Sequence, residues 1–237
     1  MRRMLVMGLA AFAALAAWAG AAGAGAATRE PEAAPDALLR SATLVVTARL
    51  RQDTTLRTDS PWNITELVEP ILPLFDFRQM TRLAVARNWR LASPEQQNAL
   101  VAEFRTLLVR TYSTALANYR DQMIEYKPLR MAPGETEVTV KSTVNQPGAE
   151  RMTIDYDMEK TTAGWRIYDV KIAAISLITT YRSTFAQTIR DGGVDGLIES
   201  LSAGNQQADS GLWPPVSGAR PLLFIYAVIP TVFRGSR

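Results

Sequence analysis

The sequence predicts an α+β protein in which a twisted antiparallel meander of four strands, or slightly more, is wrapped by about five to seven helices. Two observations support this prediction. Segments with apolar residues at every second position follow one another between residues 123 and 172, and short loops containing Pro147-Gly148 and Ala163-Gly164 join them. Segments with apolar residues at steps of three and four flank this region on both sides. Strands joined by such short loops pair antiparallel, and helices can cover one face of the resulting sheet.

The N-terminus predicts a secretory signal peptide over residues 1–26. Arg2 and Arg3 precede an uncharged apolar run over residues 4–18, and the Ala-Gly-Ala of residues 24–26 forms a small-residue cleavage site. The apolar run is shorter than the roughly 20 residues that a membrane-spanning helix needs. We therefore expect an exported protein, and the absence of cysteine from the chain agrees with a disulfide-free periplasmic one.

The charge balance excludes one class of partner. The chain has 26 Lys and Arg against 23 Asp and Glu; without Arg2 and Arg3 the count is 24 against 23, and without residues 206–237 as well it is 21 against 22. The predicted domain is therefore nearly neutral, and it lacks the excess of Lys and Arg that is typical of a nucleic-acid-binding protein. Residues 27–205 have the length of one domain with its own core, which we expect to be a monomer.

Three helix starts precede residue 90. Asp36 can cap a helix over residues 37–52. Asn63 with Glu66 has the spacing of a capping box, and prolines soon after limit that helix to a short one. Asp76 with Gln79 has the same spacing and opens a third, amphipathic helix.

The strongest helix start is Ser-Pro-Glu-Gln at residues 93–96, with a capping Ser, Pro at the first helical position and Gln at the third. From there apolar residues recur at three- and four-residue steps up to residue 119 and form one wide stripe. A helix of this length needs a large partner surface, and we expect it to cover one face of the meander.

The predicted strands cover residues 123–130, 138–144, 152–159 and 165–172. The last of them raises a question. In a regular strand, Trp165 and Ile167 would point to one side. Tyr168, Val170 and Ile172 would then point to the other side, so both faces of the strand would be apolar. An ordinary core needs only one such face.

The chain after the strands predicts two more helices and a tail. Ser176 can cap a helix whose apolar stripe ends at Gly192-Gly193, and a short helix follows over residues 196–203. Residues 206–237 differ in kind: an apolar run over residues 222–233, interrupted by a proline, is too short to span a bilayer. This extension adds a strand, sits on a hydrophobic partner, or has no role.

Catalytic and metal chemistry is poorly provided for. The chain has no His and no Cys, which removes the commonest general base and the usual zinc and iron–sulfur ligands, and we expect no metal and no cofactor. Asp155 and Asp157 share one strand face, which we interpret as a solvated polar face and not as an acid/base pair. Asp169 lies inside an apolar strand, and we expect it to accept structural hydrogen bonds.

Two stretches point to a family: FDFRQMTRLAVARNWRLASPEQQNALVAEFRTLLVRTYSTAL at residues 75–116, and WRIYDVKIAAISLITTYRSTF at 165–185 followed by GGVDGLIESL at 192–201. Together they closely resemble the MlaC family of periplasmic phospholipid-binding proteins, also called the toluene-tolerance family. The resemblance runs over roughly residues 36–205. Where the family usually has Gly, this chain has Ala86 and Ala174, and Ala is strained if either position needs a positive φ.

The resemblance implies a soluble carrier with no catalytic residue. Such a carrier moves phospholipid across the periplasm between an outer-membrane lipoprotein complex and an inner-membrane ABC transporter with an MCE-domain ring. It implies helices around a twisted sheet that encloses a lipid pocket, so the second apolar face of the last strand would contact acyl chains. Arg90 and Arg182 are candidates for meeting a phosphate or an acidic partner.

On this hypothesis, the long helix faces the sheet across the pocket and the helix after residue 176 closes its mouth. The residues expected to contact lipid are Met80, Leu83, Phe104, Leu108, Tyr112, Leu116, Val140, Met152, Ile154, Tyr156, Val170, Ile172, Leu177, Tyr181 and Phe185.

Three alternatives stay open. The cargo is another lipid, such as a hopanoid. The protein is an interaction module whose pocket is filled by side chains and which only bridges membrane complexes. The third alternative, a small-molecule enzyme on a related cone-shaped α+β scaffold, is the least favoured because His and Cys are missing.

Overall fold

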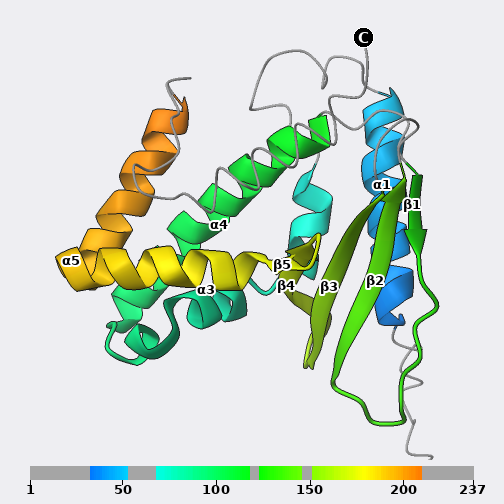
Figure 1. Cartoon of the computed structure of the whole chain (residues 1–237), viewed down its shortest axis with the longest axis horizontal. Helices are drawn as coiled ribbons and strands as arrows, with labels where there is room; N and C mark the ends of the chain where they lie inside the picture. The colour runs from blue at the N-terminus through cyan, green and yellow to red at the C-terminus, as the bar shows by residue number, and fades with distance from the viewer. Residues whose placement is uncertain (1–32, 53–67, 118–122, 146–150, 210–237) are drawn as a thin grey trace, which may run out of the picture. The chain divides into compact units, whose positions relative to one another are not determined.

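The structure, a computed structural model, describes residues 33–52, 68–117, 123–145 and 151–209. Its elements, shown in Figure 1, are α1 (Pro35–Gln52), η2 (Glu69–Leu74), α3 (Phe77–Val85), η3 (Ala86–Arg90), α4 (Pro94–Ala117), β1 (Met123–Tyr126), β2 (Glu137–Asn145), β3 (Met152–Thr161), β4 (Gly164–Ile172), β5 (Ile175–Ser176) and α5 (Leu177–Asp209). The signal peptide, the predicted capping box at Asn63 and the C-terminal extension beyond residue 209 lie outside the described residues.

The sheet is the predicted antiparallel meander with one short strand added. Its order is β1-β2-β3-β4-β5, and each strand pairs with the next along the chain. Along β2, Val138, Val140 and Val144 are buried, because they share the face that looks toward the core. The α+β fold class predicted from the sequence is confirmed.

A β-bulge answers the question raised by β4. Ile167 pairs with Met158 and Val170 pairs with Tyr156, so two residues of β4 lie opposite the single Asp157 of β3. The extra residue, Tyr168, shifts the alternation of the strand by one. Trp165, Ile167, Val170 and Ile172 therefore share one face and pack in one apolar cluster. The expectation of two apolar faces was wrong, because a regular pleat was assumed where a bulge intervenes.

The opposite, outer face of the sheet is polar. Asp157 is only 8% exposed, accepts a hydrogen bond from the Thr139 hydroxyl at 2.7 Å and pairs with the Lys171 ammonium at 2.6 Å. The interpretation of Asp157 as a solvated charge was therefore wrong: neighbouring polar side chains cover it. The prediction for Asp169 is confirmed, because its carboxylate accepts hydrogen bonds from the backbone amides of Val170 and Ile178 and from the Ser176 hydroxyl.

Helix starts follow the predicted capping chemistry. The Ser93 hydroxyl accepts from the Gln96 amide at 3.2 Å, and the Gln96 side chain accepts from the Ser93 amide at 2.9 Å. The Asp76 side chain accepts from the Gln79 amide at 2.8 Å. The Asp76 amide also donates to the Ile167 carbonyl at 2.9 Å, so the start of α3 is fixed to β4.

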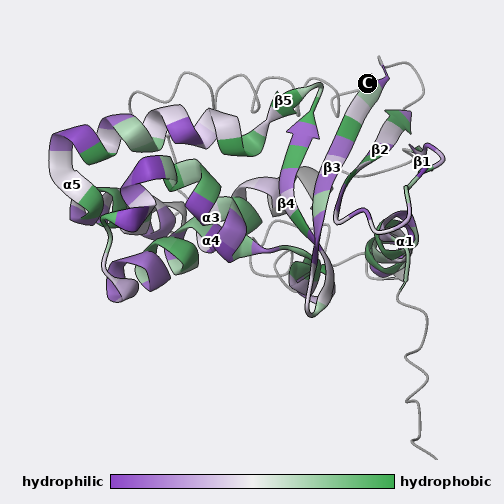
Figure 2. Ribbon diagram, turned by 90° about the horizontal axis from the view of Figure 1, so that it is seen from below, coloured by the Kyte–Doolittle hydropathy of each residue, from purple (hydrophilic) through white to green (hydrophobic). Residues whose placement is uncertain are grey.

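The three helices α3, α4 and α5 pack on one another beside β4, whereas α1 lies against one face of the sheet (Figure 2). The prediction that the long helix α4 covers the sheet was wrong. Its apolar stripe packs against α3 and α5 and not against the sheet. The buried residues of this stripe are Leu100, Phe104, Leu107 and Leu108. Helix α1, for which no particular role was predicted, covers the sheet instead.

Backbone strain lies where the family resemblance suggested. Ala86 has φ 54 and ψ −128, and Ala174 has φ 65; its neighbour Ala173 also has a positive φ, of 48. Such positive φ values favour glycine because a Cβ crowds the backbone. In α5 the predicted break at the two glycines is confirmed by Gly193, with φ 71 and ψ −171.

Candidate functional site

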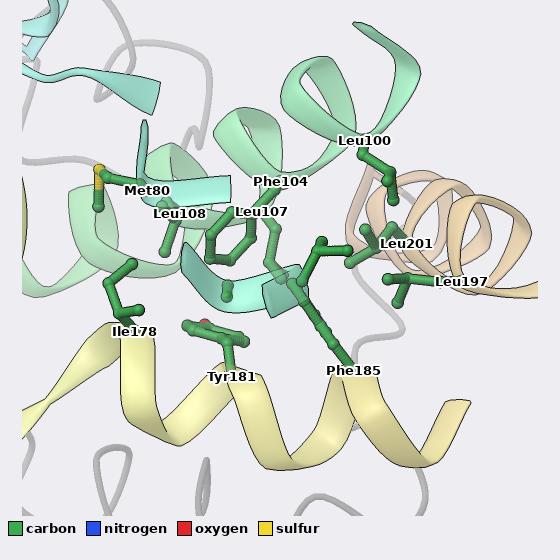
Figure 3. Packing of buried hydrophobic residues seen from close by; sticks show 12 residues of the cluster. Met80, Leu100, Phe104, Leu107, Leu108, Ile178, Tyr181, Phe185, Leu197 and Leu201 are labelled. Atoms are coloured by element: carbon green, nitrogen blue, oxygen red, sulfur yellow. The ribbon is translucent and has the colours of Figure 1, made fainter. Parts of the chain in front are cut away.

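The helical cluster is the apolar core among α3, α4 and α5 (Figure 3). Phe104 is fully buried and meets two aromatic rings edge-on, Tyr181 with 4.9 Å and Phe185 with 5.1 Å between ring centroids. The rings of Tyr181 and Phe185 are 5.6 Å apart and tilted. Such edge-to-face contacts are typical of a close-packed interior. These three side chains occupy the space between the helices themselves.

A cavity lies elsewhere, between α1 and the sheet. We call it the α1–sheet chamber, and it has a volume of about 110 Å³. Its lining comes from five elements: Leu39, Ala42, Thr43, Val46, Thr47 and Leu50 of α1; Ile71 and Leu74 of η2 with the adjoining Phe75; Ile124 and Tyr126 of β1; Tyr156 of β3; and Ile167 of β4.

Tyr126 holds α1 over the chamber. Its hydroxyl lies 2.6 Å from the Thr43 hydroxyl and donates to the Leu39 carbonyl at 3.2 Å. Arg40 donates to the Tyr126 carbonyl at 3.2 Å, and its guanidinium lies 5.1 Å from the centroid of the Tyr126 ring. The Tyr126 side chain thus reaches from β1 to α1 and keeps the first half of this helix at a fixed distance from the strand.

The chamber is apolar, and its polar atoms are engaged by neighbouring groups. The Thr47 hydroxyl donates to the carbonyls of Thr43 and Leu44 within α1. Burial raises the pKa of Tyr156, so its phenol stays neutral at physiological pH. A lining of this kind offers van der Waals contact to an apolar guest, and its titratable groups are tyrosines, a residue type whose ordinary pKa lies far above neutral pH.

The structure divides the predicted lipid-contacting residues between two cores. The helical cluster holds Met80, Phe104, Leu108, Tyr181 and Phe185, with Leu83 and Tyr112 packed against it. The second core, which we call the sheet cluster, holds Val140, Val170 and Leu177, with Tyr112, Ile154, Tyr156 and Ile172 packed against it. Met152 is buried at the start of β3, and the side chain of Leu116 lies outside the described part.

Of the residues predicted to contact lipid, Tyr156 lines the chamber, and Tyr112 packs against both cores. The sequence reasoning missed the wall that α1 supplies. A signal was present, because Leu39, Val46 and Leu50 repeat at helical spacing. Nothing in that spacing says whether a helix faces a filled core or a cavity.

The arginines proposed for phosphate contact lie outside the chamber lining. Arg182 is exposed and donates to the Leu83 carbonyl at 3.0 Å, and Arg90 is an exposed residue at the end of η3. In the described part of the chain, no cluster of acidic side chains is arranged to hold a metal ion. None of the described helices combines the length and apolar character needed to cross a membrane.

Comparison with known proteins agrees with this architecture. The family model described as "MlaC protein" matches residues 40–203. The toluene tolerance protein ttg2D of Pseudomonas putida is 26% identical over 128 residues, which cover 51% of this chain and 59% of that relative. A phospholipid-binding protein from Ralstonia solanacearum, solved in complex with a phospholipid, is similar with a TM-score of 0.69 and 41% identity, covering 74% of this chain and 98% of the solved one.

Proposed function

Since the chain belongs to the MlaC family, we propose that it is a periplasmic phospholipid carrier that takes acyl chains between α1 and the sheet. One observation carries the proposal. An apolar chamber lies between α1 and the inner face of the meander, in a chain whose sequence is 41% identical to that of a protein solved with phospholipid. Export by the predicted signal peptide over residues 1–26 would deliver it to the periplasm.

The energetics favour a carrier. Exposing two acyl chains of about 15 methylenes each to water costs on the order of 24 kcal/mol, at about 0.8 kcal/mol for each CH₂. A protein that replaces the bilayer with its own apolar wall removes most of that barrier. No bond is made or broken, so the function requires no catalytic residue.

The chamber must enlarge to hold a lipid. Its 110 Å³ is well below the volume of about 300–1,000 Å³ typical of pockets for drug-sized ligands. The side chains of Tyr156, Ile154 and Val170 pack in the sheet cluster beside it. We propose that acyl chains contact these residues as α1 moves away from the sheet. The predicted residues of the helical cluster, Phe104 among them, would be reached only if that core also opened.

The route of transport is part of the same proposal. A monomeric carrier would collect phospholipid at one membrane complex and deliver it at another, between an outer-membrane lipoprotein complex and an inner-membrane ABC transporter with an MCE-domain subunit. The family resemblance supports these partners.

The test is to extract lipid from the exported, purified protein and identify it by mass spectrometry. We expect about one diacyl phospholipid for each protein chain. Ala42→Phe places a ring in the chamber and should lower that amount about tenfold, because the guest loses its space. The matched control is Ala102→Phe, the same change at an exposed alanine of α4 that lies outside the chamber lining, which should leave the lipid content unchanged.

Other outcomes assign the function differently. A hopanoid in the extract would replace phospholipid as the cargo. Lipid-free protein that still binds membrane complexes would identify a bridging module. If Leu108→Trp removes the lipid from a folded protein and Ala42→Phe does not, acyl chains occupy the helical cluster and the chamber is not the site.

A further inference from the structure

Helix α1 is apolar on two opposite sides. Its inner side carries Leu39, Val46 and Leu50, which are buried at the chamber. Its outer side carries Leu44, which is 69% exposed, and Val45, which is 39% exposed. An amphipathic surface helix normally presents charged residues on its solvent side. The outer side of α1 therefore departs from the pattern that burial against the sheet alone would produce.

The rest of that side is small and free of acids. The outer face of α1, as we define it, consists of five exposed residues one or two helical turns apart: Ala37, Ser41, Leu44, Val45 and Ala48. Exposed arginines flank it at positions 40, 49 and 51. The Arg40 guanidinium lies 3.7 Å from the Asp36 carboxylate in the first turn, and α1 holds no other Asp or Glu. The border therefore carries net positive charge, which is electrostatically complementary to an anionic surface.

A single exposed leucine needs no explanation, since much of a protein surface is apolar. Leu91, which is 77% exposed between η3 and α4, is such a residue. The outer face of α1 differs because its apolar and small residues are continuous along the helix and its border carries net positive charge. Helices that lie in the interface of an anionic bilayer share these two properties.

We propose that the outer face of α1 docks on an anionic lipid bilayer. Leu44 and Val45 would enter the boundary between headgroups and acyl chains, while Arg51 at the border meets lipid phosphates. Each arginine near an anionic surface strengthens binding by about fivefold. Because the apolar area is small, binding is weak and reversible, as a protein that leaves the membrane again requires.

Docking would place the chamber next to a source of lipid. Helix α1 has the chamber on its inner side and would have the bilayer on its outer side, so a displacement of this one helix joins the two apolar spaces. The bonds to be broken are those between Tyr126 and the first half of α1. This consequence rests on the proposed carrier function, whereas docking itself does not.

The test measures binding of the exported protein to vesicles. Flotation is compared for vesicles of mixed phosphatidylglycerol and phosphatidylcholine and for vesicles of phosphatidylcholine alone. We expect binding to the anionic vesicles, about tenfold weaker binding after Leu44→Glu and about fivefold weaker binding after Arg51→Gln. Leu91→Glu is the matched control, with the same change at a similarly exposed leucine, and should change binding by less than about twofold.

The paired variants share both chain ends, so any vesicle binding by the termini cancels from their ratio. Equal binding of Leu44→Glu and Leu91→Glu would overturn the proposal, as would absence of binding to anionic vesicles. A dimer that Leu44→Glu dissociates, without vesicle binding, would assign the face to a second copy of the chain and would also overturn it. Loss of docking by Leu44→Glu in protein that carries no extractable lipid supports docking while rejecting the carrier function.

Discussion

The helical cluster and the α1–sheet chamber are built from the same kinds of side chain and differ in how those side chains meet. In the helical cluster, Phe104 is fully buried and in contact with two further aromatic rings. In the chamber, Leu39, Val46 and Leu50 of α1 look across a cavity of about 110 Å³. Apolar residues at helical spacing therefore indicate a buried face, but they do not tell a filled interior from a hollow one.

The difference comes from what stands opposite each helix. Helices α3, α4 and α5 contribute side chains that interdigitate, which is how close-packed interiors form. Helix α1 faces a pleated sheet, and the Tyr126 side chain spans the distance between them with its hydroxyl against Thr43. A tyrosine that reaches from a strand to a helix backbone acts as a spacer, and a cavity remains beside it.

The largest expected effect separates the two regions by stability. Phe104→Ala should lower the free energy of unfolding by about 3–5 kcal/mol, because a large void is left in a filled core. Ile71→Ala at the half-buried chamber wall should lower it by about 1 kcal/mol, because the neighbouring space is already hollow and partly accessible. Urea denaturation of lipid-free protein measures both.

Equal destabilisation by Phe104→Ala and Ile71→Ala would contradict the comparison, since it would mean that the two regions are packed alike. Adding phospholipid gives a second test of the difference between the two regions. Bound lipid should stabilise the native protein and the Phe104 variant equally, because their chamber walls are the same, and the Ile71 variant by a different amount, because only that side chain lies at the proposed site.

Backbone strain at two alanines gives a smaller effect. Ala86 lies at the end of α3, and Ala174 lies in the turn between β4 and β5. Replacing Ala86 by Gly should raise the free energy of unfolding by about 1 kcal/mol, because glycine adopts positive φ without crowding. Ala174→Gly should give somewhat less, because its φ of 65 is nearer the left-handed helical region that alanine tolerates. Thermal unfolding of the two variants checks this order.

A matched control is available in a regular helix. Ala99→Gly in the middle of α4 should lower stability by about 1 kcal/mol, the opposite sign, because glycine is a poor helix former. If Ala86→Gly also lowers stability, the positive φ at residue 86 is not a source of strain.

Much of the fold could be predicted because its signals are local. The capping chemistry at Ser93 and Asp76, the meander of strands joined by short turns and the break at Gly193 each depend on a few neighbouring residues. The two strained alanines, Ala86 and Ala174, were found from a resemblance that marked where glycine is usual. These features required no knowledge of how distant segments pack.

What could not be predicted depends on pairing between distant segments. The bulge at Tyr168 appears only when β4 is placed against β3, and it moves Val170 and Ile172 to the inner face. The sequence likewise did not show that α4 would use its stripe on α5 while α1 covered the sheet. The cavity therefore lies between α1 and the sheet and not between α4 and the sheet, where the lipid pocket was expected, and Tyr156 is the residue common to both.

The smallest effect tests the polar outer face of the sheet against its apolar inner face. A hydrogen bond from the Lys171 ammonium to the buried Asp157 raises the pKa of Lys171, and the nearby charges of Asp157, Asp169 and Asp155 add to the shift. A group whose pKa is raised on folding stabilises fully below its unfolded pKa, about 10.4 for lysine, and loses this contribution as the pH rises through the folded pKa. We therefore expect the stability difference between the native protein and Lys171→Gln to be constant near neutral pH and to shrink above about pH 10.4. Urea denaturation at a series of alkaline pH values measures this difference.

In an Asp157→Asn background the pH dependence should largely disappear, because the carboxylate that raises the pKa of Lys171 is gone. If the difference instead persists at high pH, Lys171 stabilises the sheet through the packing of its aliphatic stem and not through its charge.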